Sequence, residues 1–314
     1  MSSYQKFTKN VFIIGATYVM GALSGMILLP VITKILGPKD YGVWVQLKGT
    51  INLIIPFILL GLPSAIVRFL AVEKDKKQIR EGVYSVLFLV FFISLIVSLF
   101  LVFFAGSVAS FFQTSPLLVK ILSLVIILEC LNLVITDALV AFQELKKYSL
   151  LSIFQTVGEI LLIIGFVFLG YGLFGAVLSL VFIRLIVFSI LFIYIFRRIG
   201  IKIPNFFPIK KYLAFSLPTL GAIVSYWVIA SSDRYLINLF MGVIFVGYYA
   251  PAYAIGSILN FFIYPLTFAL SAVLPKLFDE KRIDETKNFL KYSVKYFLLI
   301  TIPAAFGLSV LSRQ

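Results

Sequence analysis

The sequence predicts an all-α fold: a polytopic transmembrane bundle of two pseudo-symmetric lobes, the first with six helices and the second with three. Composition is the first reason, since 61% of the 314 residues are hydrophobic and only 13% are charged, with a mean hydropathy of +1.09. A soluble domain of this size needs a larger polar shell. The second reason is a series of apolar stretches, and the third is a long internal repeat.

The apolar stretches predict nine membrane spans, because a helix crosses about 30 Å of hydrocarbon with roughly 20 residues. The third stretch is the clearest, since no charged residue occurs from Gly82 through Val119. In chain order, the expected spans are 11–33, 44–66, 83–105, 117–142, 150–169, 172–196, 212–233, 244–270 and 289–310.

The positions of lysine and arginine predict the orientation of these spans. With the N-terminus inside, 20 of the 27 basic residues fall in inner segments and five in outer segments. Basic residues concentrate in cytoplasmic loops, so a cytoplasmic N-terminus in the cell membrane is expected. The first span follows MSSYQKFTKN without a small-residue cleavage pattern, so we interpret it as retained.

The repeat gives the lobes their expected symmetry. Gly37 and Gly42 correspond to Gly242 and Gly247, and the segments recur at a spacing of about 206 residues. Spans 1–3 thus match spans 7–9, and an even displacement of six helices predicts parallel repeats about an axis along the membrane normal. We therefore expect residues 1–199 to form a complete first lobe. Residues 200–314 form a partial second lobe, which predicts a truncated chain.

Charged residues at membrane depth are the main candidates for function, since they are expensive there. Glu159 and Arg184 lie at similar distances from the turn near Gly170, about 16–21 Å by helical rise, which predicts an ion pair inside the first lobe. Glu129 is expected on the same side. Two carboxylates facing one arginine would leave an excess negative charge, so one would be protonated or hold a cation. A purely structural ion pair is the alternative.

Polar stripes on several spans indicate a shared central cavity. Glu129 and Asn132 lie on one face of the fourth span, and Tyr253 and Asn260 on one face of the eighth. Hydrogen bonding between helices is the alternative explanation for such residues.

Several classes of function find no support in the sequence. Histidine is absent and Cys130 is the one cysteine, which excludes an intrachain disulfide and a cysteine-rich metal site. No catalytic or phosphate-loop motif occurs, so no catalytic residue, metal or cofactor is expected. The net charge of +14 lies mainly in inner loops, which favours membrane topology over nucleic-acid binding.

Several motifs resemble a known family. They are I-L-G-P-x-x-Y-G at Ile35–Gly42, G-L-x-S-A-x-V-R-F at Gly61–Phe69, A-F-Q-x-L-x-K-Y at Ala141–Tyr148, F-S-L-P-T-L at Phe215–Leu220, S-S-D-R-Y at Ser231–Tyr235 and V-G-Y-Y-A-P-A-Y at Val246–Tyr253. The chain is similar to the polysaccharide synthase family of oligosaccharide flippases. That family belongs to the multidrug/oligosaccharidyl-lipid/polysaccharide exporter (MOP) superfamily, with twelve to fourteen helices in two lobes.

The resemblance implies transport of a polyprenyl-pyrophosphate-linked oligosaccharide from the inner to the outer leaflet. Arg68 and Arg184 would then attract the headgroup. Asn132, Tyr253 and Asn260 would line the cavity, and Glu129 and Glu159 would couple transport to protons or sodium. Arg68 alternatively snorkels to lipid phosphates. Three other functions stay open: a cation-coupled drug antiporter, a non-transporting remnant, and a membrane enzyme, which the short outer loops disfavour.

Overall fold

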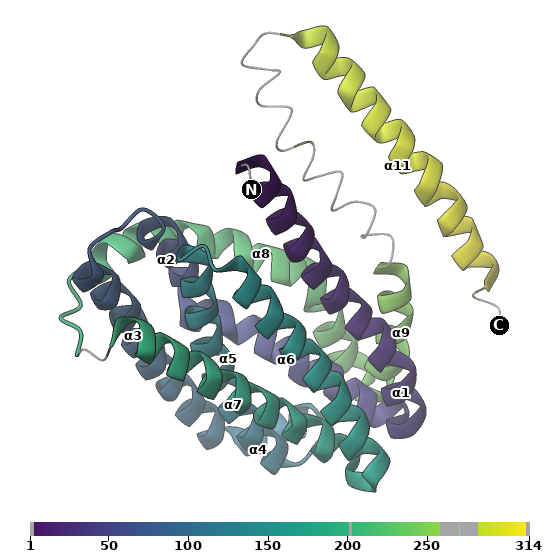
Figure 1. Ribbon diagram of the computed structural model, residues 1–314. Helices are drawn as coiled ribbons and strands as arrows, with labels where there is room; N and C mark the ends of the chain where they lie inside the picture. The colour runs from purple at the N-terminus through teal and green to yellow at the C-terminus, as the bar shows by residue number, and fades with distance from the viewer. Residues whose placement is uncertain (1–2, 201–202, 258–269, 271–281, 312–314) are drawn as a thin grey trace. The chain divides into compact units, whose positions relative to one another are not determined.

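The computed structural model describes residues 3–200, 203–257, 270 and 282–311, and all of its regular elements are helical, as predicted (Figure 1). The chain divides into two compact units, Met1–Tyr248 and Tyr249–Gln314. The elements are α1 (Ser3–Leu59), α2 (Leu62–Leu70), α3 (Lys76–Phe103), α4 (Ala105–Phe111), α5 (Pro116–Ala141), α6 (Leu145–Phe166), the π-turn η1 (Val167–Tyr171), α7 (Gly172–Ile199), α8 (Ile209–Met241), α9 (Val243–Gly256) and α11 (Ile283–Leu311).

Six helical stretches of the described chain are long and apolar enough to cross a membrane. Two of them each hold a pair of predicted spans. The stretch Leu23–Leu59 is broken at Gly37, so a break between the first two predicted spans is present, but the second helix starts earlier than the predicted residue 44. The stretch Leu145–Ile199 contains the turn at Gly170, as predicted. Only the beginning of the eighth predicted span is described, as α9, and the rest lies outside the described residues.

Gly37 divides α1 because its backbone, at φ 72° and ψ 175°, is not helical. Gly242, its counterpart in the repeat, ends α8 with φ 94° and ψ 166°. This region of φ and ψ is essentially restricted to glycine. The two copies of the repeat therefore begin with the same backbone conformation.

We expect Gly37→Ala to lower the free energy of unfolding by about 1–3 kcal/mol, because a Cβ at this φ and ψ is strained. Nothing lies within 4 Å of that Cβ, so the backbone alone would cause the loss. Thermal unfolding in detergent measures it. Gly25→Ala is the control, since Gly25 also has open space but lies in regular helix. That change should leave stability unchanged or raise it by up to about 1 kcal/mol. Equal effects at the two sites would contradict the argument.

The second span ends differently from the prediction of one helix over 44–66. Gly61, at φ 71°, interrupts it, and α2 starts directly afterwards with Pro63 in its first turn. Proline suits that position because its missing N–H would have no helical partner. α3 begins at Lys76, earlier than predicted, where the Asp75 side chain accepts a hydrogen bond from the Lys77 backbone. The short helix α4 was not predicted.

α5 is the most enclosed of the long helices, and it contacts α2, α3, α4 and α7 (Figure 1). Its buried side chains are mainly Leu, Ile and Val. α6 packs against both α1 and α7. This arrangement brings one face each of α1, α5, α6 and α7 into the interior of the first lobe.

The helix starts that open the two repeats, directly after Gly37 and Gly242, touch each other reciprocally. A Cβ on Gly42 would overlap the carbonyl oxygen of Val243, and a Cβ on Gly247 would overlap that of Pro38. Pro38 and Val243 are themselves counterparts in the repeat, so the contact has the form of a two-fold interface. Inverted repeats would put these helix starts on opposite membrane faces. Their contact therefore agrees with the predicted parallel relation.

The linker between the predicted lobes is held against α3. The Glu81 carboxylate accepts a hydrogen bond from the Asn205 backbone, and the Tyr84 hydroxyl donates to the Gly200 carbonyl at 2.7 Å. α8 then packs along α1 and α2. The predicted lobe boundary, between residues 199 and 200, follows the sequence repeat. The boundary between the compact units comes later in the chain, after Tyr248, because α8 packs on the first lobe. The lobe boundary stays a prediction.

Candidate functional site: a buried ion network

Four charged side chains from four helices meet inside the first lobe. Arg184 of α7 binds two carboxylates: its Nε lies 2.5 Å from Oε2 of Glu129 on α5, and its Nη1 lies 3.1 Å from Oε2 of Glu159 on α6. Lys48 of α1 completes the network, with Nζ 2.6 Å from Oε1 of Glu159. The predicted pair of Glu159 and Arg184 is thus confirmed, with Glu129 on the same side.

The four residues lie at a common depth. Each is about 11–13 residues from the end of its helix on the predicted outer side, at Gly37, Pro116, Gly170 or Gly172. At 1.5 Å per residue this depth is about 16–20 Å, near the middle of the bilayer. Arg184 is the best-shielded member, with 6% of its side chain exposed, so it faces the interior and not lipid.

Close helix packing holds the pair in place. Gly158 precedes Glu159, and a Cβ there would overlap the Cδ1 methyl of Ile183, the residue before Arg184. Glycine inside a helix costs roughly 0.5–1 kcal/mol relative to alanine. Here it allows α6 and α7 to approach at the level of the ion pair. The glycine next to Glu159 could have indicated this close approach from the sequence, but the prediction used only the depth of the charged residues along their helices.

Asn132 supports the arginine through its backbone. Its Nδ2 donates to the Arg184 carbonyl oxygen at 3.0 Å, and Thr136 donates to the Asn132 carbonyl oxygen at 2.6 Å. Asn132 is 2% exposed. Its amide therefore links α5 to α7, which is the helix-bonding role weighed as the alternative for the polar stripes.

Lys48 corrects one sequence expectation. Two carboxylates with a single arginine predicted excess negative charge, but the Lys48 ammonium makes the network formally neutral. The residue was missed because span 2 was expected to start at residue 44, which placed Lys48 near the outer surface. The helix instead resumes directly after Gly37, so Lys48 lies about 16 Å below the start of that helix.

The remaining predicted site residues lie elsewhere or are not described. Arg68, on α2, has its guanidinium carbon 5.1 Å from the centre of the Phe215 ring on α8, which is a cation–π contact rather than an ion pair. Tyr253 lies on α9 in the second unit, with its ring 5.8 Å from that of Tyr249. Asn260 lies outside the described residues.

Lys48 is the most exposed member of the network. Lys48 is 33% exposed, twice as much as either carboxylate, and its Nζ also lies 5.2 Å from the centre of the Trp44 ring. An incoming anion would therefore meet the ammonium first. Among the described residues, no group of three or more Asp, Glu, Cys or His side chains is arranged to hold a metal ion.

Solved transporters share this fold. The chain is 17% identical to the MATE multidrug transporter DinF-BH, with a TM-score of 0.67 over 96% of this chain and 72% of that chain. It is 18% identical to an inward-facing multidrug resistance MATE transporter of the MOP superfamily, with a TM-score of 0.64 over 90% of this chain and 68% of that chain. It is 17% identical to an outward-facing multidrug resistance MATE transporter, with a TM-score of 0.60 over 98% of this chain and 73% of that chain. No curated protein sequence matches.

The membrane-length helices and the likeness to solved transporters define the class of this chain. It is a multi-pass helical membrane protein with the MOP transporter fold. Residues 7–279 match the family described as "Polysaccharide biosynthesis protein", which covers most of the chain. The chain belongs to this family. The resemblance found in the sequence motifs is thereby confirmed.

Proposed function

We propose that the protein moves polyprenyl-pyrophosphate-linked oligosaccharides across the cell membrane, with its N-terminus in the cytoplasm. It carries out transport without chemical conversion of the substrate. The family description links the chain to polysaccharide biosynthesis, and the fold is shared with transporters. A polar headgroup needs a charged, wet path through the bilayer, and its prenyl tail can remain in lipid.

The observation that carries this proposal is the partly exposed position of Lys48 in the ion network. A pyrophosphate competes with Glu159 for the Lys48 ammonium, while Arg184 remains held by both carboxylates. In this proposal Lys48 contacts the substrate and Arg184 positions the network. Glu129 and Glu159 serve ion coupling when Lys48 turns toward the substrate, since a carboxylate then loses a partner and can take a proton or sodium ion.

The test is a translocation assay in proteoliposomes with a fluorescent polyprenyl-pyrophosphate oligosaccharide and an external glycosidase. We expect Lys48→Met to lower the rate at least tenfold, because the first cation on the path is lost. Lys48→Arg should keep part of the rate. Lys120→Met is the matched control, since Lys120 is exposed near the start of α5 and lies outside the network. Equal rates for Lys48→Met and the unchanged protein would contradict the proposal.

A cation-coupled drug antiporter is the second candidate, since the solved relatives of this fold are described as multidrug transporters. Export of organic cations favours a cavity with excess negative charge. The neutral network does not provide that excess. Uptake of ethidium, a fluorescent organic cation, driven by a proton or sodium gradient in the same vesicles would establish this alternative if the oligosaccharide substrate is not moved.

A further inference from the structure

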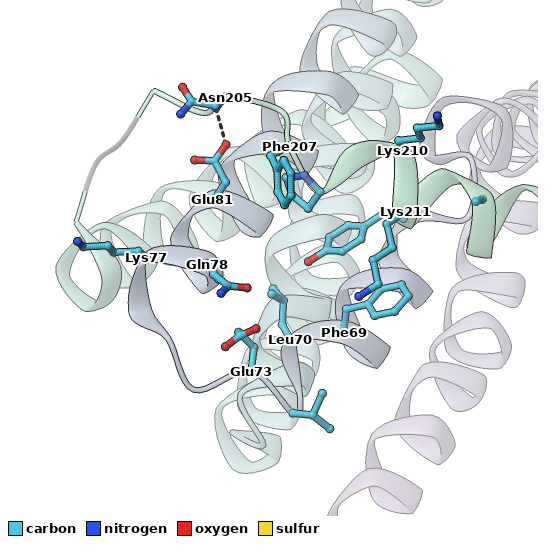
Figure 2. A pocket seen from close by; sticks show the side chains of 14 residues that line it. Phe69, Leu70, Glu73, Lys77, Gln78, Glu81, Asn205, Phe207, Lys210 and Lys211 are labelled. Atoms are coloured by element: carbon cyan, nitrogen blue, oxygen red, sulfur yellow. Dashed lines mark hydrogen bonds between the residues drawn. The ribbon is translucent and has the colours of Figure 1, made fainter.

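A cavity of about 830 Å³ lies at the predicted inner face, far along the helices from the ion network. It is bounded by α2, the start of α3, the linker and the start of α8 (Figure 2). Apolar side chains provide much of its wall, including Phe69, Leu70 and Phe207. The rings of Phe69 and Tyr212 stack at 5.1 Å between centres, so this wall is built by α2 and α8 together.

The charged groups at this cavity are not equivalent. Glu81 accepts the Asn205 backbone N–H, and Glu73 accepts the backbone N–H groups of Lys74 and Asp75 at 2.9 Å each. Both carboxylates are thus engaged by the protein's own backbone.

Three lysines flank the same cavity, namely Lys77, Lys210 and Lys211. Within the described part of the chain, none of their ammonium groups forms a salt bridge; Lys211 Nζ lies 4.5 Å from the centre of the Phe69 ring. Figure 2 shows Lys211 lying across Phe69, with Lys77 and Lys210 at opposite ends of the cavity. The cavity therefore offers available positive charge above apolar walls.

The rim also carries apolar side chains in the open. Val72 is 78% exposed and Phe207 is 89% exposed, and both line the cavity. In water such exposure is costly, but at a bilayer interface these side chains contact acyl chains. Basic pockets between transmembrane helices on the cytoplasmic side are suited to anionic lipid headgroups.

We propose that this cavity binds an anionic glycerophospholipid of the inner leaflet. The phosphate pairs with Lys211, Lys77 and Lys210 add positive potential at the rim, and an acyl chain lies against Phe69, Leu70 and Phe207. This lipid is a resident ligand and not the transported substrate. Because the walls of the cavity come from α2, α3 and α8, the bound lipid connects the first lobe to the start of the second.

The test is native mass spectrometry of the detergent-solubilised protein, titrated with phosphatidylglycerol or phosphatidylcholine. We expect preferential retention of phosphatidylglycerol. Lys211→Gln should weaken its binding about fivefold, and the triple change of Lys77, Lys210 and Lys211 to Gln at least tenfold. Ala214→Trp, which places a bulky side chain in the cavity, should reduce the preference.

The matched control changes three exposed lysines of α11 to Gln, namely Lys287, Lys291 and Lys295. It removes the same amount of positive charge as the triple change at the cavity. It should leave phosphatidylglycerol binding unchanged. An equal loss in the control, or equal retention of the two lipids, would show non-specific attraction and overturn the proposal. Displacement by millimolar inorganic phosphate would identify a soluble-anion site instead, and displacement by polyprenyl diphosphate a substrate site. Unchanged binding in Ala214→Trp would place the lipid elsewhere.

Discussion

Arg184→Met is expected to lower the free energy of unfolding by about 3–5 kcal/mol, the usual cost of removing one partner from a buried ion pair. Arg184 holds Glu129 and Glu159 together, and 6% of its side chain is exposed. Its loss leaves Glu129 without its cation inside the lobe and Glu159 with Lys48 alone. Unfolding by titration with a denaturing detergent, followed by tryptophan fluorescence, measures the change.

A fully neutral network is the control for this prediction. Combining Lys48→Met, Glu129→Gln, Glu159→Gln and Arg184→Met should restore most of the lost stability, because no unpaired charge then remains. Translocation should stay low in this variant, since Lys48 is absent. If Arg184→Met alone costs less than about 1 kcal/mol, the network does not stabilise the lobe in the way its geometry indicates.

A simple exchange of charges is not a clean test of this site. Glu159→Arg combined with Arg184→Glu would place a guanidinium beside Lys48 and a carboxylate beside Glu129. Both new contacts are repulsive. We therefore expect the exchange to destabilise the protein whatever the function of the network.

Gly42→Ala is expected to separate the helix starts that open the two repeats. A Cβ at Gly42 would overlap the backbone carbonyl of Val243, and no side-chain rotation relieves a clash with backbone. Overpacking of this kind typically costs about 1–3 kcal/mol, so the closed contact should lose most of its population. Electron–electron spin distances between labels introduced by Lys39→Cys and Ile244→Cys, with Cys130→Ala, should lengthen by several ångströms.

The repeat supplies further controls for the contact between the two helix starts. Gly247→Ala should lengthen the same distance, because its Cβ would overlap the Pro38 carbonyl in the same interface. The two changes together should have little more effect than either alone, since both open one contact. Gly25→Ala, with open space around its Cβ, should leave the distance unchanged. An unaltered distance in Gly42→Ala would show that the two helix starts adjust without separating.

The sequence predicted the parts of this fold that depend on local composition and chain spacing. Apolar length located the described spans, and helical rise placed Glu159 and Arg184 at one depth. Lys48 was not predicted as their partner because it is 111 residues from Glu159, and its depth depended on where the second helix starts. A boundary error of about two helical turns was enough to hide it.

Contacts between distant segments were the other limit. The repeat predicted that Gly42 and Gly247 are equivalent, but equivalence does not reveal that the two helix starts touch. The interruption at Gly61 was readable in principle, since glycine followed two residues later by proline favours a helix boundary. Predicting membrane spans from the length of apolar stretches alone missed this interruption, because Gly61 and Pro63 lie within an apolar stretch.

The balance of charge in the network has an electrical consequence. Moving one elementary charge across the whole membrane potential involves about 2.3 kcal/mol per 100 mV. Lys48, Glu129, Glu159 and Arg184 carry two positive and two negative charges, so they sum to zero. A rigid rotation of the first lobe therefore moves no net charge of this network through the field. Voltage dependence of transport would therefore report on charges other than these four side chains, such as those of the proposed substrate.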